Sequence, residues 1–543
     1  MTSTFVAAGP FAGQKPGTSG LRKKTAEFMR PGYLECFVQA VFDAIGGVSG
    51  KVLVLGGDGR YFGRQAAETI LRMAAAGGAA RVIVGRGAIL STPAASHLIR
   101  LNAADGGLIL SASHNPGGPD GDFGVKYNIA NGGPAPEAVT AAIHAATERV
   151  TGYHIAGAPA PDLDRIGESR LDGMVVQVVD PVTDYAALME RLVDFDAIRA
   201  LVAGGFRMRF DAMSAVTGPY AVEILEHRIG FAPGTVVNAV PEPDFGGHHP
   251  DPNPAHARDL WDELMGPDAP DFGAASDGDG DRNMILGRGV YVSPSDSLAV
   301  IAANAHLCKG YAGGIRGIAR SMPTSAAADR VAAHLGVDLH ETPTGWKFFG
   351  TLLDAGRATI CGEESFGTGS DHVREKDGLW AVLIWLNILA ARGKGVAEVL
   401  DGHWRQFGRN YYSRHDYEAL PVAAAEAVMA GLRAALPGLP GRVVAGMTVT
   451  AADDFAYRDP VDGSSSAGQG LRVAFEGGAR IVLRLSGTGT EGATLRLYLD
   501  RMEDDPDRMA QDPQEALAPL IAAAEDLAGI ARLTGRAVPD VIT

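Results

Sequence analysis

The chain is poor in cysteine, in positive charge and in long apolar runs, and each shortage excludes a class of protein. Its three cysteines, Cys36, Cys308 and Cys361, lie far apart in 543 residues and form no CxxC pair. This spacing argues against a disulfide framework and a cysteine-based zinc site, and it predicts reduced, buried thiols. No apolar run is long enough to cross a bilayer, and no basic region with an apolar core opens the chain. We therefore expect a cytoplasmic protein without a membrane partner.

The charge balance argues against polyanionic partners. Lysine and arginine number 48 against 64 aspartates and glutamates, which gives a net charge of −16. Such a surface repels nucleic acid, so no nucleic-acid partner is expected. A phosphorylated substrate would need a locally basic site. The motifs discussed below supply Arg22, Lys23, Lys24, Lys126, Arg282, Arg374, Lys376, Arg484 and Arg496.

The periodicity of the apolar residues predicts an α/β protein of several domains. Short apolar runs at 52–55, 82–84 and 108–110 are typical of buried strands, and the segments 64–76 and 93–101 are typical of the helices between them. Strands that alternate with helices indicate a mainly parallel sheet. The same rhythm returns at 208–210, 272–275, 315–319 and 359–361. At 543 residues the chain is too long for one core.

A turn that carries two serines and a histidine follows one of these runs. Residues 107–110 lead into Ser-Ala-Ser-His-Asn-Pro-Gly-Gly at 111–118. If 107–110 is a strand, this turn lies at the carboxyl edge of a sheet, where ligands bind in α/β proteins. Asn-Pro-Gly-Gly reverses the chain and leaves Ser113 at the tip, able to carry a phosphoryl group. The same residues also suit an ordinary hairpin, so the turn alone favours function only slightly.

Three aspartates alternate with glycines in Asp277-Gly-Asp279-Gly-Asp281-Arg282. Like charges this close raise one another's pKa unless a divalent cation or an arginine neutralises them. An EF-hand begins similarly, but it needs Gly at its sixth position and Glu at its twelfth, where this chain has Arg282 and Arg288. Three carboxylates leave room for water or a phosphate oxygen, which suits Mg²⁺ better than a closed calcium cage. A solvated acidic turn is the alternative.

Two further segments are rich in turn residues. In the Gly/Pro-rich stretch 241–250, His248 and His249 are adjacent and lack the helical spacing of metal ligands, so we expect a surface loop. Near the C-terminus, a strand-like run at 481–485 contains Arg484, and Arg496 follows in a second alternating segment. Between them lie glycines and hydroxyls that form a plausible phosphate cradle, Ser486, Gly487, Thr488, Gly489 and Thr490.

Taken together, these motifs resemble the α-D-phosphohexomutase superfamily and, within it, the family of long, muscle-type phosphoglucomutases. Besides the serine and aspartate motifs, the similarity includes Asn-Met-Ile-Leu-Gly at 283–287, Ala-Arg-Ser-Met-Pro-Thr-Ser at 319–325, Glu-Thr-Pro-Thr-Gly-Trp-Lys-Phe-Phe-Gly at 341–350 and Cys-Gly-Glu-Glu-Ser-Phe-Gly at 361–367. It covers nearly the whole chain.

The resemblance implies three related α/β domains with mixed, mainly parallel sheets and a C-terminal α+β domain around a central cleft. The implied domains are 1–187 with the phosphoserine loop, 188–293 with the metal-binding loop, 294–407 with the sugar-recognition loops, and 408–543 with the phosphate-binding loop.

The resemblance also implies a phosphotransferase of glucose metabolism that acts as an isomerase (EC 5.4.2.2) between glucose 1-phosphate and glucose 6-phosphate. Phosphorylated Ser113 would give its phosphoryl group to O6, and the resulting glucose 1,6-bisphosphate would turn end for end and return the O1 phosphoryl to Ser113. The implied cofactors are Mg²⁺ and, as activator and intermediate, glucose 1,6-bisphosphate. The implied partners are small hexose phosphates.

Residue roles carry over where this sequence matches the family's motifs. The resemblance implies Mg²⁺ bound by Asp277, Asp279, Asp281 and a phosphate oxygen on Ser113. His114, Arg22 and Arg282 would contact the same phosphoryl group. Lys126 matches the family's general acid/base, and we expect the metal and nearby arginines to lower its pKa.

The remaining implied residues bind substrate. Glu363 and Ser365 match the pair that holds sugar hydroxyls, and Thr344 and Gly345 match the loop that distinguishes the O1 and O6 ends. Phosphate contacts are implied for Arg374, Lys376, Arg484, Ser486, Gly487, Thr488, Gly489, Thr490 and Arg496.

Two departures and three alternatives accompany this interpretation. Ser111 stands where the family commonly has Thr, and we choose Ser113 as nucleophile because it directly precedes His114-Asn-Pro. Thr490-Glu491 differs from the usual small pair and weakens the role of Thr490. The alternatives are a mutase for mannose or glucosamine phosphate, a metal-dependent phosphatase that uses Ser113, and a catalytically silent binding or structural relative.

Overall fold

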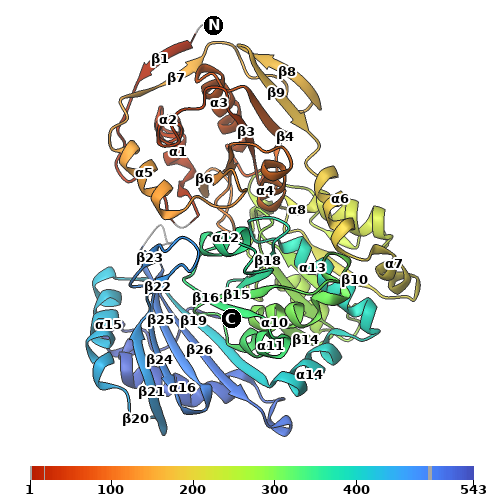
Figure 1. Ribbon diagram of the computed structural model, residues 1–543, viewed down its shortest axis with the longest axis vertical. Helices are drawn as coiled ribbons and strands as arrows, with labels where there is room; N and C mark the ends of the chain where they lie inside the picture. Colours follow the sequence, from red (N-terminus) through yellow and green to blue (C-terminus); the bar gives the residue numbers. More distant parts are fainter. Residues whose placement is uncertain (1–2, 18, 487–491) are drawn as a thin grey trace.

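Four folded units follow one another along the chain, and Figure 1 shows them in sequence colours. The computed structural model describes residues 3–17, 19–486 and 492–543. In the first unit, seven strands lie in the order β2-β6-β5-β3-β4-β9-β8. These strands are β2 Leu21–Lys24, β3 Val52–Gly57, β4 Arg81–Ile89, β5 Gly106–Leu110, β6 Asp122–Ile129, β8 Gly167–Leu171 and β9 Met174–Val179. A separate pair is formed by β1 Ser3–Ala7 and β7 Gly152–Ala156.

The helices of the first unit and of the connection to the second confirm the predicted alternation. They are α1 Thr25–Phe28, α2 Tyr33–Ala44, α3 Gly63–Ala76, α4 Thr92–Leu101, α5 Glu137–Thr147, α6 Thr183–Leu192 and α7 Phe195–Ala203. The predicted helices at 64–76 and 93–101 correspond to α3 and α4, and the predicted strands to β3, β4 and β5. Ser91 ends the preceding loop and caps α4, because its side chain accepts a hydrogen bond from the backbone N–H of Ala94.

The next two units have smaller sheets. Five strands are ordered β11-β10-β12-β13-β14 and four are ordered β16-β15-β17-β18. They are β10 Met208–Asp211, β11 Val236–Val237, β12 Phe272–Ser276, β13 Asn283–Gly287, β14 Val290–Val292, β15 Gly317–Ser321, β16 Asp338–Thr342, β17 Ile360–Glu363 and β18 Gly367–Ser370. Their helices include α8 Thr217–Ala221, α9 Arg258–Met265, α10 Pro294–Asn304, α11 Ala327–Leu335, α12 Lys347–Asp354, α13 Gly378–Arg392 and α14 Val396–Phe407.

One strand pattern recurs in all three sheets. Each contains a central strand with a parallel neighbour on both sides, β4-β3-β5, β11-β10-β12 and β16-β15-β17. In each, the last of these strands then turns back into an antiparallel partner, β6, β13 or β18. The three units are therefore related α/β domains, and the hairpin that closes each pattern occupies an equivalent place. These three hairpins carry the predicted serine, aspartate and sugar-binding motifs.

The C-terminal unit differs. Its seven-stranded sheet, β20-β21-β24-β25-β26-β19-β27, is antiparallel throughout. The strands are β19 Arg409–Leu420, β20 Val443–Val444, β21 Met447–Asp454, β24 Leu471–Phe475, β25 Arg480–Ser486, β26 Ala493–Glu503 and β27 Val541–Ile542. A small pair joins β22 Tyr457–Arg458 to β23 Ser465–Ser466, and the helices are α15 Val422–Ala435, α16 Pro513–Ala528 and α17 Ile530–Thr534. This is the α+β unit that the sequence predicts.

Helix α13 is largely buried and shows how the core is built. Asp377 caps it by accepting a hydrogen bond from Trp380 N at 3.0 Å, and Gly393 ends it in the left-handed conformation. Trp380 and Trp385 are fully buried between the second and third sheets. Among the described residues no single helix is long and apolar enough to span a membrane; α13 and α14, bent by 83°, pass that test only as a pair.

The cysteines agree with their prediction, whereas the domain limits stay a prediction. Cys36, Cys308 and Cys361 are all free and buried. The expected limit after residue 187 falls inside α6, whereas those after 293 and 407 fall between elements.

Candidate active site

The three equivalent hairpins come together through direct contacts. The β5–β6 loop carries Ser113, whose Oγ donates a hydrogen bond to Asp277 Oδ2 in the β12–β13 loop at 2.9 Å. The backbone N–H of Asn283, at the end of that second loop, donates to the carbonyl of Phe366 in the β17–β18 loop at 2.9 Å. Ser113 and Asp277 are 164 residues apart in sequence, yet they belong to one site.

Ser113 sits in a strained and enclosed position. It is 1 % exposed and adopts a positive φ of 55°, which is costly for a residue other than glycine. Its own N–H donates to Ser111 Oγ at 2.7 Å, so the second serine of the motif supports the turn. His114 Nδ1 lies 3.5 Å from Ser113 Oγ. The turn therefore points the Ser113 hydroxyl at the acidic loop rather than at solvent.

Arg60 holds this turn in place, and sequence reasoning missed it. Its guanidinium donates to the carbonyl oxygens of Ser113 at 2.8 Å and Asp122 at 2.7 Å. Both Arg60 and its ion-pair partner Asp58 have fully buried side chains, with Nε 2.9 Å from Oδ2. The ring of Phe245 lies 5.2 Å from the guanidinium. Only the short spacing of Asp58 and Arg60 after a predicted strand could have pointed to this pair.

The acidic loop closes tightly around Ser113. The three aspartates are at most 3 % exposed, and one oxygen from each lies within 4.8 Å of the others. Asp277 Oδ1 accepts the backbone N–H groups of Asp281 at 2.9 Å and Arg282 at 3.0 Å. Gly278 is required here, because a Cβ would stand 2.4 Å from the carbonyl oxygen of Ser113.

The electrostatics of the loop fit a bound cation. Burial, followed by the charges of Asp281 and Asp279, raises the pKa of Asp277 well above its ordinary value. Among the described residues, Asp279 Oδ1 and Asp281 Oδ1 are buried and have no hydrogen-bond partner. Unpartnered carboxylate oxygens that converge in a buried loop are the donor set that a hard divalent cation takes. The residues present therefore fit Mg²⁺.

Lys126 on β6 lies against the same carboxylates. Its Nζ pairs with Asp279 Oδ2 and lies 3.7 Å from Asp281 Oδ2. Burial alone would lower the pKa of Lys126, but Asp279 and Asp281 outweigh it and raise the pKa above its ordinary value. The raised pKa of Lys126 is opposite to the lowered pKa that we expect from the sequence on account of a metal and nearby arginines. A cation that took up these carboxylates would weaken their effect on the lysine.

The other predicted phosphoryl contacts are brought to this place as well. Burial and the charges of Arg282 and Arg22 hold the pKa of His114 well below its ordinary value. Burial lowers the pKa of Arg22, which lies on β2 and whose Nε has no partner among the described residues. Arg282 Nε lies 3.9 Å from Asp277 Oδ2, and its NH1 lies 3.5 Å from Asp251 Oδ1. A second contact that sequence reasoning missed is Thr92, which donates to Asp279 Oδ2 at 2.6 Å.

The sugar-binding motifs are linked by one hydrogen bond. The backbone N–H of Gly345 donates to Glu363 Oε1 at 2.7 Å. Burial raises the pKa of Glu363, while Lys376 opposes that rise. Thr344 Oγ1 is buried without a hydrogen-bond partner in the described part of the chain, and Ser365 is half-buried. Gly345 is thus brought to Glu363, whereas the sugar contacts of Thr344, Gly345, Glu363 and Ser365 stay a prediction.

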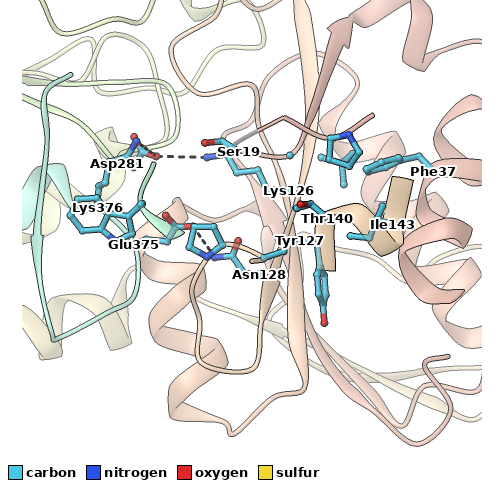
Figure 2. A pocket seen from close by; sticks show the side chains of 16 residues that line it. Ser19, Phe37, Lys126, Tyr127, Asn128, Thr140, Ile143, Asp281, Glu375 and Lys376 are labelled. Carbon is cyan, nitrogen blue, oxygen red and sulfur yellow. Dashed lines mark hydrogen bonds and ion pairs between the residues drawn. The ribbon is translucent and has the colours of Figure 1, made fainter. Parts of the chain in front are cut away.

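Figure 2 shows side chains that line a cavity beside β6. Lys126, Asp281 and Lys376 line one part of it, and Lys376 Nζ lies 3.5 Å from Asp281 Oδ2. Glu375 also lines it and accepts a hydrogen bond from Asn128 Nδ2 at 2.9 Å. Burial raises the pKa of Glu375 to about 7. Sequence reasoning passed over this carboxyl because it sits between two residues that resemble phosphate ligands.

Arg374 has other partners than those expected. Its Nε donates to Asp354 Oδ1 at 2.6 Å, and its NH1 donates to the carbonyl oxygens of Asp371 and Val373. Its backbone N–H donates to Ser96 Oγ in the first domain at 2.9 Å. These contacts tie the first domain to the third, and the phosphate role of Arg374 stays a prediction.

The C-terminal sheet brings two of the predicted clamp residues face to face. Arg484 on β25 and Arg496 on β26 are direct cross-strand partners, an arrangement that like charges disfavour unless an anion separates them. Asp416 Oδ2 lies 3.5 Å from Arg496 Nε and gives partial compensation. The side chain of Ser486 and the residues Gly487, Thr488, Gly489 and Thr490 lie outside the described part of the chain.

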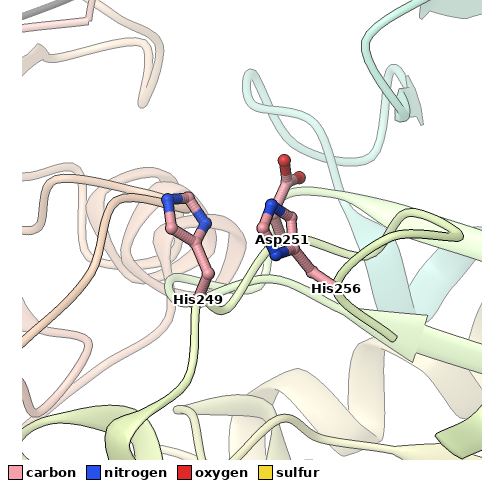
Figure 3. Close-up of side chains that lie close together, drawn as sticks. All are labelled: His249, Asp251 and His256. Atoms are coloured by element: carbon pink, nitrogen blue, oxygen red, sulfur yellow. The ribbon is translucent and has the colours of Figure 1, made fainter. Parts of the chain in front are cut away.

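The loop 241–250 lies mostly at the surface, as predicted, but it is not exposed throughout. His248 is exposed, whereas Phe245 is fully buried and His249 is half-buried with its ring 6.2 Å from that of His114. His249 also forms a cluster with Asp251 and His256, shown in Figure 3. The spacing of His248 and His249 alone gives no sign of this cluster, because its other members follow later in the chain.

Comparisons with known proteins cover the same four units. The models of the phosphoglucomutase/phosphomannomutase α/β/α domains I, II and III match residues 13–154, 183–289 and 294–407. The model of the phosphoglucomutase-1 C-terminal domain matches residues 409–540.

Individual relatives match over nearly the full length. A phosphoglucomutase from Rhizobium radiobacter is 62% identical over 98% of this chain and 98% of its own. A cytoplasmic phosphoglucomutase from Pisum sativum is 48% identical, again over 98% of both chains. The solved structure of the exocytosis-sensitive phosphoprotein pp63/parafusin, a phosphoglucomutase from Paramecium in an open form, has a TM-score of 0.91 and 47% identity, and covers 100% of this chain and 99% of that one.

Proposed function

The chain belongs to the phosphoglucomutase family of α-D-phosphohexomutases, isomerases (EC 5.4.2.2) that interconvert glucose 1-phosphate and glucose 6-phosphate, and we propose that it does so through phosphorylated Ser113. The observation that carries this proposal is the hydrogen bond from Ser113 Oγ to Asp277 Oδ2. This bond supports the proposal because it holds the Ser113 hydroxyl beside a carboxylate cluster suited to a divalent cation. That pairing is what phosphoryl transfer to and from a serine needs.

Mg²⁺ held by Asp277, Asp279, Asp281 and a phosphate oxygen on Ser113 would neutralise the charge of the transferring phosphoryl group. Three side chains of the protein also stabilise the charge of the phosphoryl group. Arg22 and Arg282 donate to the phosphoryl oxygens, and His114, neutral beside these arginines, donates from its ring.

Lys126 moves the proton in each half-reaction. When a sugar hydroxyl attacks the phosphoserine, the bond from phosphorus to Ser113 Oγ breaks and Lys126 Nζ takes the hydroxyl proton. When Ser113 Oγ then attacks the bisphosphate, the protonated lysine returns that proton to the departing sugar oxygen. This role needs a neutral lysine for part of the cycle. The ion pairs with Asp279 and Asp281 favour the charged form of Lys126, so this role requires a cation on the two carboxylates.

Recognition of the sugar is divided between two places. Glu363 and Ser365 bind hydroxyls of the ring, and Thr344 and Gly345 contact the end that carries O1 or O6. The remote phosphate is held by Arg484, Arg496 and Lys376 together with Ser486, Gly487, Thr488, Gly489 and Thr490. Both ends of glucose 1,6-bisphosphate carry phosphate. The same clamp therefore holds one end before the intermediate turns round and the other end afterwards.

The test is conversion of glucose 1-phosphate to glucose 6-phosphate with Mg²⁺ and a trace of glucose 1,6-bisphosphate. We expect activity in the wild type and none above background in Ser113→Ala. Inorganic phosphate is measured in the same samples, because its release at the rate of turnover would favour a phosphatase. Mannose 1-phosphate and glucosamine 1-phosphate are assayed in parallel, and faster turnover of either would contradict the preference for glucose.

We also propose a cytoplasmic location. Relatives named as cytoplasmic match over nearly their whole length, although relatives named as chloroplastic match as well.

A further inference from the structure

A cluster of two imidazoles and one carboxylate lies beside the active site and takes no part in the proposed reaction. It consists of His249, Asp251 and His256, and one ligand atom from each lies within 4.8 Å of the others (Figure 3). The rings of His249 and His256 are stacked, with centroids 4.5 Å apart and an interplanar angle of 16°. Two imidazoles and a carboxylate are the ligand set of many transition-metal sites, whereas the aspartate triad offers oxygen alone.

Two buried atoms of this cluster have no hydrogen-bond partner among the described residues. They are His249 Nδ1 and Asp251 Oδ1, which are both inaccessible to solvent. Unsatisfied buried polar atoms carry a free-energy cost that a ligand can remove. Arg282 NH1 lies 3.5 Å from Asp251 Oδ1, too far for a strong bond to that oxygen. The other oxygen, Oδ2, accepts from Asn253 Nδ2 at 2.8 Å and so fixes the orientation of the carboxylate.

The charged neighbours of the cluster act on a cation in both directions. Asp251 and Asp122 attract a cation here, whereas Arg282 repels it.

The distances define how far the side chains must move. In a tetrahedral site with bonds of about 2.1 Å, ligand atoms lie about 3.4 Å apart. Separations of up to 4.8 Å therefore require a contraction of at most about 1.4 Å. His256 is exposed and can provide this movement by a rotation of its side chain that also turns its ring out of the stack on His249, because two nearly parallel stacked rings cannot direct their nitrogens at one ion. Asp251 is held in place by its hydrogen bond from Asn253.

We propose that His249, Asp251 and His256 bind a divalent transition metal of the Zn²⁺ type, separate from the Mg²⁺ site at the aspartate triad. The fourth position is open to water. Because Asp251 is shared with Arg282, the metal and the arginine compete for the same carboxylate, and occupation of the site weakens one anchor of Arg282.

The experiment measures metal stoichiometry in the full-length protein. Wild type, His256→Ala and His248→Ala are dialysed to equilibrium against Zn²⁺ in the presence of excess Mg²⁺, and bound zinc is determined by elemental analysis. His248 is the matched control, because it is an exposed histidine of the same loop outside the cluster. Since His256 is also exposed, its replacement should leave the thermal midpoint unchanged, which is checked in the same samples.

We expect one equivalent of zinc fewer in His256→Ala than in wild type, with at least tenfold weaker binding, and no change in His248→Ala. Zinc that also enters the aspartate triad adds equally to all three proteins and leaves this difference intact. Co²⁺ should give the stronger visible absorption of a nitrogen-containing tetrahedral site in wild type and His248→Ala, but not in His256→Ala. Equal stoichiometry in wild type and His256→Ala, or an equal loss in both variants, overturns the proposal.

Discussion

Ser113 Oγ donates a hydrogen bond to Asp277 Oδ2 over 2.9 Å, from the first α/β domain to the second. The two residues occupy the same hairpin in two related sheets, after the third strand of each pattern. One domain therefore contributes the proposed nucleophile and the other the candidate cation-binding loop. Any movement between the two domains changes the distance between Ser113 and that loop.

The first prediction separates the two serines of the turn. Ser111→Ala should keep measurable activity, reduced by about tenfold, because the Ser111 hydroxyl supports the turn by accepting a hydrogen bond from Ser113 N and by bonding to the Asp58 carboxylate. Ser113→Ala should lose activity and should no longer take up label from ³²P-labelled glucose 1,6-bisphosphate. Protein labelling is measured by gel autoradiography. Label retained in Ser113→Ala and lost in Ser111→Ala would reverse the assignment.

The second prediction concerns the buried pair beneath the turn. Arg60→Ala should destabilise the protein by about 3 to 5 kcal/mol, because it leaves Asp58 buried and unpaired. Asp58→Ala/Arg60→Ala should recover part of the thermal midpoint, since it removes the unpaired charge. Activity should stay low in the double variant, because the carbonyl of Ser113 has still lost its donor. Full activity in a stably folded double variant would show that Arg60 has no positioning role.

These two predictions also show where sequence reasoning reached its limit. The strands before the serine and aspartate motifs could be predicted from their apolar runs, and so could the chemistry of both loops, because hydroxyl, carboxylate and glycine patterns are local. Arg60 could not be found, since its role depends on reaching the carbonyls of Ser113 and Asp122 from another loop. Arg374 was assigned to phosphate from its motif, although its contacts lie at a domain interface. Such contacts are set by tertiary packing, which one sequence does not display.

The third prediction tests the cation site through stability. Mg²⁺ should raise the thermal midpoint, because it binds the folded triad and relieves repulsion among buried carboxylates. At a hundred times its Kd the gain should be about 2.7 kcal/mol. Asp281→Asn should weaken the effect, and Asp504→Asn, at an exposed position, should not. Differential scanning fluorimetry across a Mg²⁺ titration measures this, and a midpoint that is independent of Mg²⁺ would contradict the assignment.

The fourth prediction concerns the facing arginines of the C-terminal sheet. Arg496→Met should raise the KM for glucose 1-phosphate at least tenfold, because a charge-assisted contact to phosphate is lost. The thermal midpoint should stay equal or rise, because the substitution removes a like-charge cross-strand pair. Arg501→Met on the same strand is the control, since Arg501 donates to the carbonyl of Ala516 and lies away from Arg484. Steady-state kinetics of both variants decide the point, and an unchanged KM in Arg496→Met would exclude a direct contact.

The fifth prediction concerns acid stability and rests on a buried histidine far from the reaction. Burial, and then the charges of Arg330 and Arg392, lower the pKa of His403 from 6.5 to about 4. Between these values the unfolded chain takes up a proton that the folded chain refuses, so the stability falls as the pH falls from 6.5 towards 4. Above that window both states are neutral and the histidine has no effect.

Acidification from about pH 7 to about pH 4.5 should therefore cost the wild type about 2 to 3 kcal/mol more than His403→Gln, which cannot take up a proton. The readout is the thermal midpoint at a series of pH values, with His306→Gln at an exposed position as control. Burial also lowers the pKa of His97 to about 4, so the variant should keep part of the acid sensitivity. Parallel curves for wild type and His403→Gln would mean that the folded protein protonates His403 as readily as the unfolded chain does.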